Sequence, residues 1–304
     1  MTTKISMVGK PEVGKTTIKK VIFEGEDPNE LVLFPLEATI GIQYSVHDFM
    51  DIKISLLDSP GQSLPLLLED EQKQLMTFGD TSAIIYIFDY PTWIENSQDI
   101  IDDIKKIYEI KKKLEVDAKI VLFLHKIDLL INKKIGSMLA LIRRQVVKQL
   151  NLPEEFPIYF TSLHPNLIYT VYNAISDIFS NFSKDSSNLK EIIKETITGL
   201  SKTICVVSNQ KNNLIIQVST PDFDASTLYY LYEVIYQFSK STEEINSKSK
   251  VINAGSKILY MLGDDISKFN SNFKNLIFFS EILEENELHK LLSDVKGNLN
   301  QKYN

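Results

Sequence analysis

Gly9-Lys10-Pro11-Glu12-Val13-Gly14-Lys15-Thr16 follows an apolar, strand-like run at residues 5–8 and precedes a helix-like run at residues 17–23. The octapeptide fits the pattern G-x-x-x-x-G-K-[ST]. In this pattern backbone N–H groups point at phosphate oxygens, because glycine adopts dihedral angles that residues with side chains rarely adopt. The helix that follows adds the positive end of its dipole. Lys15 is expected to reach the β and γ phosphates, and Thr16 to ligate Mg²⁺. The stretch predicts a nucleoside triphosphate site at a strand end.

The composition is that of a globular protein large enough for two domains. The chain has 304 residues, of which 43% are hydrophobic and 24% charged, and its formal net charge is -7. That charge gives no support to nucleic-acid binding. A single cysteine, Cys205, excludes an internal disulfide and is typical of a reducing compartment. The sequence contains neither an apolar signal region nor a run of about 18 uncharged apolar residues. We therefore expect a cytoplasmic protein without direct membrane insertion, which partners would recruit to any membrane.

The first 183 residues alternate between strand-like and helix-like runs. The strand-like runs lie at residues 5–8, 43–49, 52–57, 83–88, 120–124 and 157–160, and the helical patterns at 16–23, 93–113, 135–150 and 167–182. This alternation predicts an α/β domain at 1–183 with a mostly parallel six-stranded sheet covered on both faces. Ligands of such sheets bind at the carboxyl ends of strands, which is where the phosphate loop falls.

The rest of the chain is interpreted as a smaller α+β domain at 189–304, reached through a polar linker at 184–188. We expect an antiparallel sheet there, and no catalytic constellation is visible. The expected elements are a helix at 189–201, strands at 204–208 and 214–219, a helix at 226–239, a polar stretch at 241–250, strands at 257–262 and 275–280, and a helix at 285–299. Tyr229, Tyr230, Tyr232 and Tyr236 fall outside the core stripe of their helix. Tyrosine is enriched at interfaces, so dimerisation is one reading and packing on the domain's own sheet the other.

A second motif, Asp58-Ser59-Pro60-Gly61-Gln62, follows the strand at 52–57. Asp58 is expected to hold a water on Mg²⁺, and the Gly61 N–H to meet the γ phosphate. Thr39, in the irregular stretch before the second strand, would complete the Mg²⁺ shell only when the γ phosphate is present. Residues 24–42 and about 61–80 would then be two switch segments. Taken alone, the motif is also compatible with an acidic turn.

The third motif, His125-Lys126-Ile127-Asp128, ends the strand at 120–124 and selects the base. The Asp128 carboxylate accepts hydrogen bonds from guanine N1–H and N2–H, a donor pair that adenine lacks. The Lys126 stem would lie over the base, and His125 would either donate to the guanine edge or brace the phosphate loop. Thr161-Ser162-Leu163 would bring a backbone N–H near the guanine carbonyl oxygen. Charged residues that merely end a strand are the alternative.

Together these motifs resemble the Rag/Gtr branch of the Ras superfamily. His125, where most of that superfamily has asparagine, is similar to this branch, as is the run 161–163 that leads into 167–169. The order of elements after the linker resembles the roadblock/longin-like dimerisation domain of Rag proteins, which would follow an α/β P-loop GTPase domain. The resemblance implies GTP/GDP binding with Mg²⁺, slow GTP hydrolysis and nutrient signalling of the TORC1 type. It also implies pairing through the C-terminal domain with a second Rag-like subunit or with another copy, and a roadblock-type scaffold at an endomembrane as a further partner.

The resemblance assigns three sets of site residues. The expected nucleotide-binding residues are Pro11, Glu12, Val13, Gly14, Lys15, Thr16, Thr17, Thr39, Gly61, His125, Lys126, Asp128, Ser162 and Leu163. The expected metal ligands are Thr16, Thr39 and Asp58. The expected catalytic residues are Gln62, which would place the attacking water, with Thr39 and Lys15. Pro11 and Glu12 depart from the small residues usual in the family, and Pro11 has no N–H to give.

Efficient GTP hydrolysis is expected to require a second protein. An arginine finger is typically worth roughly 10³ to 10⁵ in rate. The chain has two arginines, Arg143 and Arg144, in the helix at 135–150 and away from the expected γ phosphate. We interpret the pair as a solvated helix face and expect a GTPase-activating protein to act in trans. A nucleotide-locked scaffold with negligible turnover is the alternative function, whereas an ATP-driven machine conflicts with Lys126 and Asp128.

Overall fold

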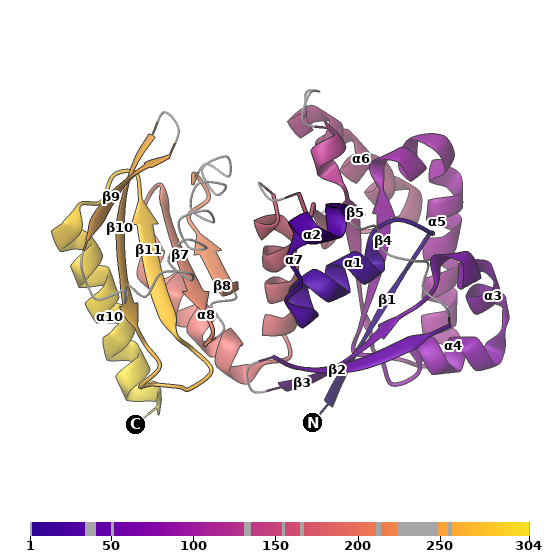
Figure 1. Cartoon of the computed structure of the whole chain (residues 1–304), viewed down its shortest axis with the longest axis horizontal. Coiled ribbons are helices and arrows are strands. Elements are labelled where there is room, and N and C mark those ends of the chain that lie inside the picture. Colours follow the sequence, from indigo (N-terminus) through magenta and orange to yellow (C-terminus); the bar gives the residue numbers. More distant parts are fainter. Residues whose placement is uncertain are drawn as a thin grey trace. The chain divides into compact units, whose positions relative to one another are not determined.

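The computed structural model divides into two compact units, Met1–Val171 and Tyr172–Asn304 (Figure 1). It describes residues 2–33, 41–49, 52–130, 135–153, 156–164, 167–210, 214–223, 249–254 and 257–303. Thr39 and the tyrosine-bearing helix expected at 226–239 lie outside these ranges. Among the helices within them, none is long and apolar enough to cross a membrane.

The first unit is built on a six-stranded sheet. Its strands are β1 (Thr2–Gly9), β2 (Gln43–Phe49), β3 (Ile52–Asp58), β4 (Ala83–Asp89), β5 (Lys119–His125) and β6 (Ile158–Phe160). Their order across the sheet is β2-β3-β1-β4-β5-β6. Every neighbouring pair is parallel except β2 with β3, which is antiparallel. The prediction of a mostly parallel α/β sheet is therefore confirmed.

Helices lie on both faces of this sheet, with α1 on one side and α5 on the other (Figure 1). In this unit the described helices are α1 (Lys15–Lys19), the π-helix η1 (Lys20–Glu24), α2 (Pro28–Leu33), η2 (Gly61–Ser63), α3 (Leu64–Glu69), α4 (Glu71–Phe78), α5 (Tyr90–Lys113), η3 (Ile127–Leu130) and α6 (Ile135–Leu150). α7 (Tyr169–Ser180) spans the division between the units. The helix expected at 16–23 is thus split into α1 and η1. Residues 61–78, part of the second expected switch segment, form η2, α3 and α4.

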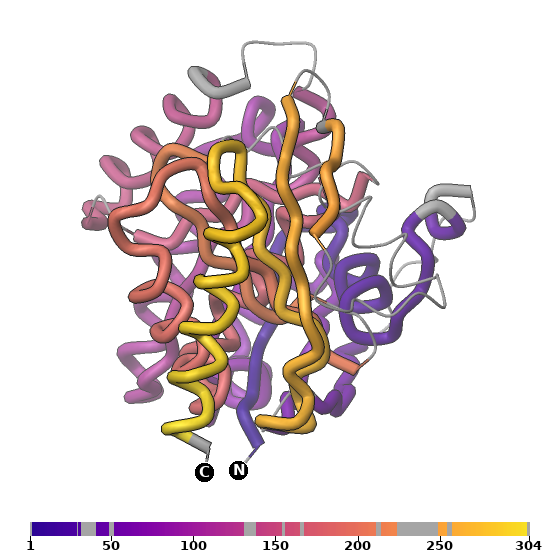
Figure 2. The backbone as a smooth tube through the Cα atoms, turned by 90° about the vertical axis from the view of Figure 1, so that its left-hand side faces the viewer, coloured from indigo at the N-terminus to yellow at the C-terminus, as the bar shows by residue number. Residues whose placement is uncertain are grey.

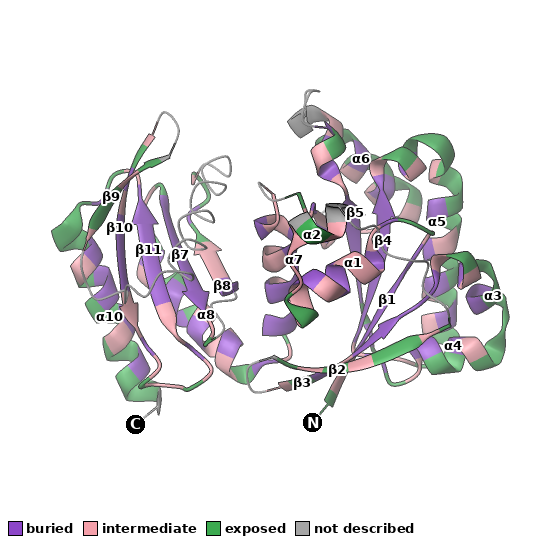
Figure 3. Ribbon diagram, viewed as in Figure 1, coloured by how far each residue is buried: buried purple, intermediate pink, exposed green. Residues whose placement is uncertain are grey.

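A large hydrophobic cluster of the first unit lies between the sheet and α5. Every residue of β4 is buried, as its continuous apolar run predicts for a central strand (Figure 3). Ile100, Ile104 and Ile107 recur at helical spacing along α5 and are fully buried in the same cluster as Tyr86 and Phe88. Burying each such side chain contributes about 1.5 to 3 kcal/mol. This packing fixes the strand ends from which the site residues project.

The described part of the second unit has a five-stranded antiparallel sheet with helices beside it (Figure 2). Its elements are α8 (Lys184–Ile197), β7 (Thr203–Ser208), β8 (Leu214–Ser219), β9 (Lys250–Ala254), β10 (Lys257–Asp265), β11 (Asn275–Ser280) and α10 (Glu285–Tyr303). The strand order is β8-β7-β11-β10-β9. α8 packs on β8, α10 packs on β10, and the two helices contact each other. An antiparallel α+β unit was expected here.

Two details of the second unit differ from the expectation. Residues 184–188, interpreted as a linker, form the start of α8, because the Ser183 hydroxyl accepts the Ser186 N–H at 3.0 Å and caps the helix. Serine and asparagine are common both in loops and at helix N-termini, so the composition of residues 184–188 did not distinguish a linker from the start of a helix. Strand β9 was also unexpected, since its first residue, Lys250, ends the stretch that was interpreted as polar.

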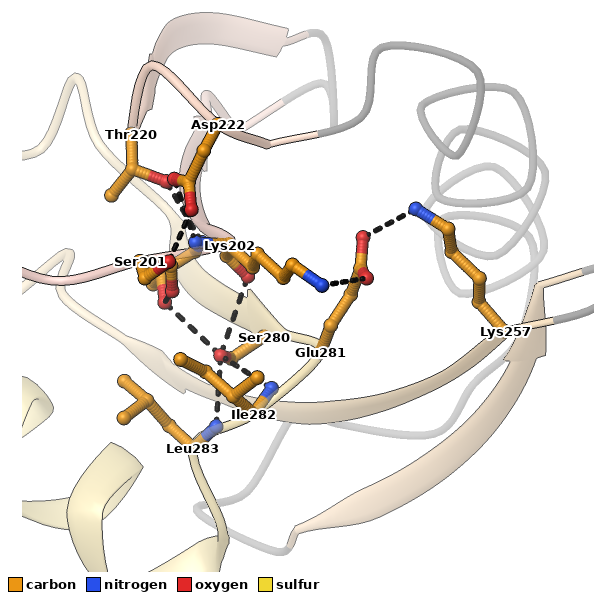
Figure 4. A network of polar contacts seen from close by, with 10 residues as sticks. Ser201, Lys202, Thr220, Asp222, Lys257, Ser280, Glu281, Ile282 and Leu283 are labelled. Atoms are coloured by element: carbon orange, nitrogen blue, oxygen red, sulfur yellow. Dashed lines mark hydrogen bonds and ion pairs between the residues drawn. The ribbon is translucent and has the colours of Figure 1, made fainter.

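Polar contacts join the strand ends of the second unit (Figure 4). The Lys202 N–H donates to Asp222 at 2.9 Å, and hydrogen bonding led by Ser201 lowers the pKa of Asp222 to about 2. Glu281 lies between the ammonium groups of Lys202, at 3.6 Å, and Lys257, at 2.7 Å. These contacts tie β10 and β11 to the start of β7.

Candidate nucleotide-binding site

Two glycines of the phosphate loop are required by sterics. Gly9 has φ 152, and a Cβ there would lie 2.0 Å from the carbonyl oxygen of Ile87 in the adjacent β4. Gly14, with φ 94, caps α1, and a Cβ there would lie 2.9 Å from Cδ2 of His125. Val13, between them, is fully buried, and Thr17 is half-buried in the first turn of α1. The motif therefore has the strand, loop and helix context that the sequence predicted.

Pro11 and Glu12 form the exposed crest of this loop. Glu12 adopts the left-handed conformation with φ 60, which costs a side-chain-bearing residue about 1 to 2 kcal/mol. Its carbonyl oxygen accepts a hydrogen bond from Lys126 Nζ at 2.6 Å. The loop is thus held in its curved form by the base-selecting motif, despite a residue poorly suited to that conformation.

Lys15 folds across the loop. Its ammonium group donates to the carbonyl oxygens of Gly9, at 3.0 Å, and Lys10, at 2.7 Å. Burial lowers the pKa of Lys15 to about 8, against the opposing attraction of Asp58. A buried ammonium group bonded only to neutral carbonyls is favourably placed to exchange them for anionic oxygens.

Thr16 and Asp58 meet where the metal was expected. The Thr16 hydroxyl donates to Oδ2 of Asp58 at 2.7 Å, and the carboxylate is fully buried. Its other oxygen, Oδ1, is buried and has no hydrogen-bond partner within the described part of the chain. Burial raises the pKa of Asp58, opposed by the Thr16 hydrogen bond and by the charges of Lys15 and Lys19. An unsatisfied carboxylate oxygen beside a hydroxyl is a donor set that suits Mg²⁺. The third expected ligand, Thr39, lies outside the described residues.

Gly61 brings the second motif against the phosphate loop. A Cβ on Gly61 would lie 2.4 Å from Cα of Pro11 and 2.6 Å from the carbonyl carbon of Lys10, so only glycine fits. The neighbouring Ser59 hydroxyl donates to the Met7 carbonyl oxygen at 3.2 Å and anchors the turn to β1. Gln62, the expected water-placing residue, is exposed in η2.

The two base-recognition segments are joined by hydrogen bonds. The Ser162 hydroxyl donates to Oδ1 of Asp128 and accepts the His164 N–H at 3.0 Å. The Ser162 N–H donates to the Thr170 hydroxyl at 2.9 Å. Asp128 is half-buried, as is Leu163, the next residue along the loop. The structure therefore brings the segment 161–163 next to the Asp128 carboxylate, while the contact of this segment with guanine stays a prediction.

Asp89 is a site residue that the sequence reasoning missed. At the end of β4 it accepts the ammonium group of Lys126 at 2.9 Å and caps α5 by accepting the Thr92 N–H at 3.0 Å. Burial acts to raise the pKa of Asp89, but the hydrogen bonds from Thr92 and Lys126 outweigh it, so the pKa is lowered. The signal was available, because an aspartate directly before a helical pattern with a proline in its first turn is typical of a helix N-cap.

His125 braces the loop. Its Nδ1 lies 2.9 Å from the Thr161 hydroxyl, and its ring lies against Gly14 with 2% of the residue exposed. Burial lowers the pKa of His125 to about 4, so the ring is neutral at neutral pH. Of the two roles expected for this histidine, the contacts favour bracing the phosphate loop over donating to guanine.

The interpretation of the paired arginines is wrong for one of them. Arg143 is half-buried, and its guanidinium donates to the carbonyl oxygens of Phe156, at 3.0 Å, and Ile158, at 3.4 Å. It joins α6 to the start of β6, so its role is structural. Arg144 is exposed on α6, as expected of a solvated face.

Residues 4–241 match the family described as the Gtr1/RagA G protein conserved region. The chain is 25% identical over 178 residues to Ras-related GTP-binding protein A of Dictyostelium discoideum, a match that covers 58% of this chain and 57% of that protein. It is also 25% identical over 207 residues to GTP-binding protein GTR1 of Saccharomyces cerevisiae, covering 65% and 63%. The chain thus spans about six tenths of the length of these curated relatives. On the extent of the family match, this chain belongs to the Gtr1/RagA family of Rag/Gtr-type small GTPases.

Proposed function

We propose that this protein is a nucleotide-dependent switch that binds GTP and GDP with Mg²⁺ and hydrolyses GTP slowly. The observation that carries the proposal is the buried Asp58 carboxylate, with one oxygen 2.7 Å from the Thr16 hydroxyl and the other without a partner among the residues that the structure describes. Such an orphaned anionic oxygen is costly unless a ligand completes it. Its place between the phosphate loop and the end of β3 favours a hydrated cation beside a triphosphate.

Binding would exchange internal contacts for contacts to the nucleotide. Lys15 would release the carbonyl oxygens of Gly9 and Lys10 for phosphate oxygens, gaining a charge-assisted interaction. Asp128, oriented by the Ser162 hydroxyl, would accept the guanine N1–H and N2–H. Thr16 and Asp58 would hold Mg²⁺, with Thr39 as the third candidate, and the ion would neutralise charge on the phosphates. Phosphate affinity and guanine selectivity therefore come from different ends of the site.

Hydrolysis would be slow in the isolated chain. Gln62 is exposed at the start of η2, so nothing in its described surroundings orients it toward a water. Arg143 is committed to the carbonyl oxygens of Phe156 and Ile158 and is not available to the γ phosphate. A GTPase-activating protein in trans would supply or orient the missing charge, which is typically worth roughly 10³ to 10⁵ in rate.

The second unit would serve as a roadblock/longin-like dimerisation domain that follows the GTPase domain. The order α8, β7, β8, then β9, β10, β11 and α10, in an antiparallel sheet, supports this proposal. The partner would be a second Rag-like subunit or another copy of this chain, with a roadblock-type scaffold as a further contact. The signalling role would be of the nutrient-responsive, TORC1 type.

The test is to purify the full chain, extract and identify its nucleotide, and measure its mass in solution and its rate of GTP hydrolysis. We expect guanine nucleotide at about one per chain, dependence on Mg²⁺ and turnover far below 1 s⁻¹. Preferential binding of ATP, or of no nucleotide, would reject the proposal. Retention of GTP with no turnover, even with candidate activating proteins, would favour a nucleotide-locked scaffold. The lack of an N–H at Pro11 makes that second function worth testing.

A further inference from the structure

Lys10, the first variable residue of the phosphate loop, is tied to α5 behind the loop. Val8 pairs with Tyr86 across β1 and β4, and both lie in the cluster packed against α5. Lys10 continues the alternation of side chains from Val8 and reaches the same face. Its ammonium group lies 3.0 Å from Oδ2 of Asp103 on α5, and the Tyr86 hydroxyl donates to that oxygen at 2.9 Å. Three elements thus converge on one carboxylate.

The surroundings make this link stronger than an ordinary surface ion pair. The side chains of Lys10 and Asp103 are 23% and 15% exposed, so water and salt screen their attraction little. Tyr86 is fully buried, and its hydroxyl would lose this hydrogen bond if the carboxylate were removed. By contrast, Lys105 and Asp102 on the same helix are 3.7 Å apart and 50% and 54% exposed, an arrangement that contributes little.

The link acts on the peptide between Lys10 and Pro11. The carbonyl oxygen of Lys10 accepts the ammonium group of Lys15 at 2.7 Å. The same peptide is the surface on which Gly61 packs, since a Cβ there would lie 2.4 Å from the Pro11 nitrogen. Lys15 and Gly61 belong to the two phosphate-facing motifs, and both therefore contact the Lys10-Pro11 peptide. Asp103 holds the side chain of Lys10 in place.

We infer that Asp103 is a positioning residue for nucleotide binding. Through Lys10 it holds the Lys10-Pro11 peptide in the place where Lys15 and Gly61 can both address the phosphates, and so it slows nucleotide release. Asp103 does not itself contact the nucleotide. The inference rests on the proposed function, because it needs a bound guanine nucleotide, and it adds α5 to the elements that set the lifetime of that complex.

The experiment uses the full chain loaded with a fluorescent GDP analogue, whose release is followed after adding excess GDP. Asp103→Asn and Lys10→Met should each speed release by about fivefold to tenfold, which matches the typical net contribution of one hydrogen bond. The double variant should be no faster than either single variant, because both remove the same link. Lys10→Arg keeps a cation within reach of Asp103 and should restore slow release. The matched control is Asp102→Asn, one residue along α5, which should match the wild type.

Two readouts separate positioning from general stability. The phosphorus-31 resonance of the GDP β phosphate should shift in Asp103→Asn and in Lys10→Met but not in Asp102→Asn, whereas a purely structural effect would leave it unmoved. If Asp103→Asn does not fold, the comparison of Lys10→Met with Lys10→Arg decides. Release within twofold of the wild type in Lys10→Met, or effects that multiply in the double variant, would overturn the inference. A wild-type chain that binds no guanine nucleotide would reject the proposed function and the inference together, while normal binding with unchanged release rejects only the inference.

Discussion

Replacing Gly14 by alanine adds two separate costs to the first unit, and the structure gives the size of each. The left-handed backbone of Gly14, at φ 94, costs an alanine about 1 to 2 kcal/mol. The new Cβ would lie 2.9 Å from Cδ2 and 3.1 Å from Nε2 of His125. That ring cannot move away easily, because it is buried and bonded to Thr161 at 2.9 Å, so overpacking adds about 1 to 3 kcal/mol. We expect Gly14→Ala to lower the free energy of unfolding by about 2 to 5 kcal/mol.

The chain offers a matched control for the backbone cost. Gly25 also has a left-handed backbone, at φ 76, but a Cβ there would meet nothing within 4 Å. Gly25→Ala should therefore cost only about 1 to 2 kcal/mol. The steric part should disappear when the ring is removed, so Gly14→Ala should cost less in a His125→Ala background, with a coupling energy of about 1 to 3 kcal/mol.

The assay is urea unfolding followed by the fluorescence of Trp93. Trp93 is the single tryptophan of the chain. It lies in the first unit, 4% exposed and with its ring 5.7 Å from that of Phe88, so its emission follows the unit that carries the substitution. Two results would refute the reasoning. One is a Gly14→Ala cost within about 0.5 kcal/mol of that of Gly25→Ala, and the other is an unchanged cost in the His125→Ala background.

Three further predictions concern charge in the site. Asp58→Asn keeps the shape of the side chain beside Thr16 but removes its negative charge, so the affinity for Mg²⁺ should fall at least about tenfold. The rate of GDP release with and without EDTA checks this. A response to EDTA as large as that of the wild type would contradict the prediction. Asp128→Asn should weaken the binding of GTP by about 2 kcal/mol or more and favour xanthosine triphosphate, whose O2 accepts the new amide N–H. Competition binding measures both affinities. An unchanged affinity for GTP would contradict the role of Asp128 in base recognition. Burial lowers the pKa of Lys15 from its ordinary value of 10.5 to about 8 in the folded chain, so the unfolded state binds more protons between these pH values. The free energy of unfolding of nucleotide-free protein should then rise by up to about 1.4 kcal/mol per pH unit in that window. Urea midpoints at about pH 7.5 and pH 9.5 should show a smaller rise in Lys15→Met than in the wild type, and an equal rise would contradict the burial of Lys15.

The parts of the fold that local patterns determine were predictable. The run of six apolar residues at 83–88 predicts a central strand, and β4 is buried throughout. The phosphate loop was recognisable because Gly9 and Gly14 meet backbone or ring atoms that no side chain tolerates. The pairing of Thr16 with Asp58 followed from the rule that parallel strands present their carboxyl ends at one edge.

The parts that depend on distant contacts were not predictable from one sequence. In the sequence Asp103 reads as a solvent-exposed charged residue of a helix. Only the packing of α5 on β4 brings it to Lys10. The role of Arg143 depends on the path of the chain between α6 and β6. Strand β9 is specified by pairing with β10 rather than by its own composition, so Lys250 and Asn253 concealed it.

The strand order of the second unit has a consequence for its synthesis. β11 is the last strand of the unit in the chain but the central strand of its five-stranded sheet, where it separates the hairpin of β7 and β8 from that of β9 and β10. Its pairing of Ser280 with Thr203 closes a loop of 77 residues, at an entropic cost of about 4 kcal/mol. Neither hairpin can join the other until β11 has left the ribosome. A chain interrupted before Asn275 would leave two hairpins with bare edges, which are templates for aggregation rather than a smaller version of the unit.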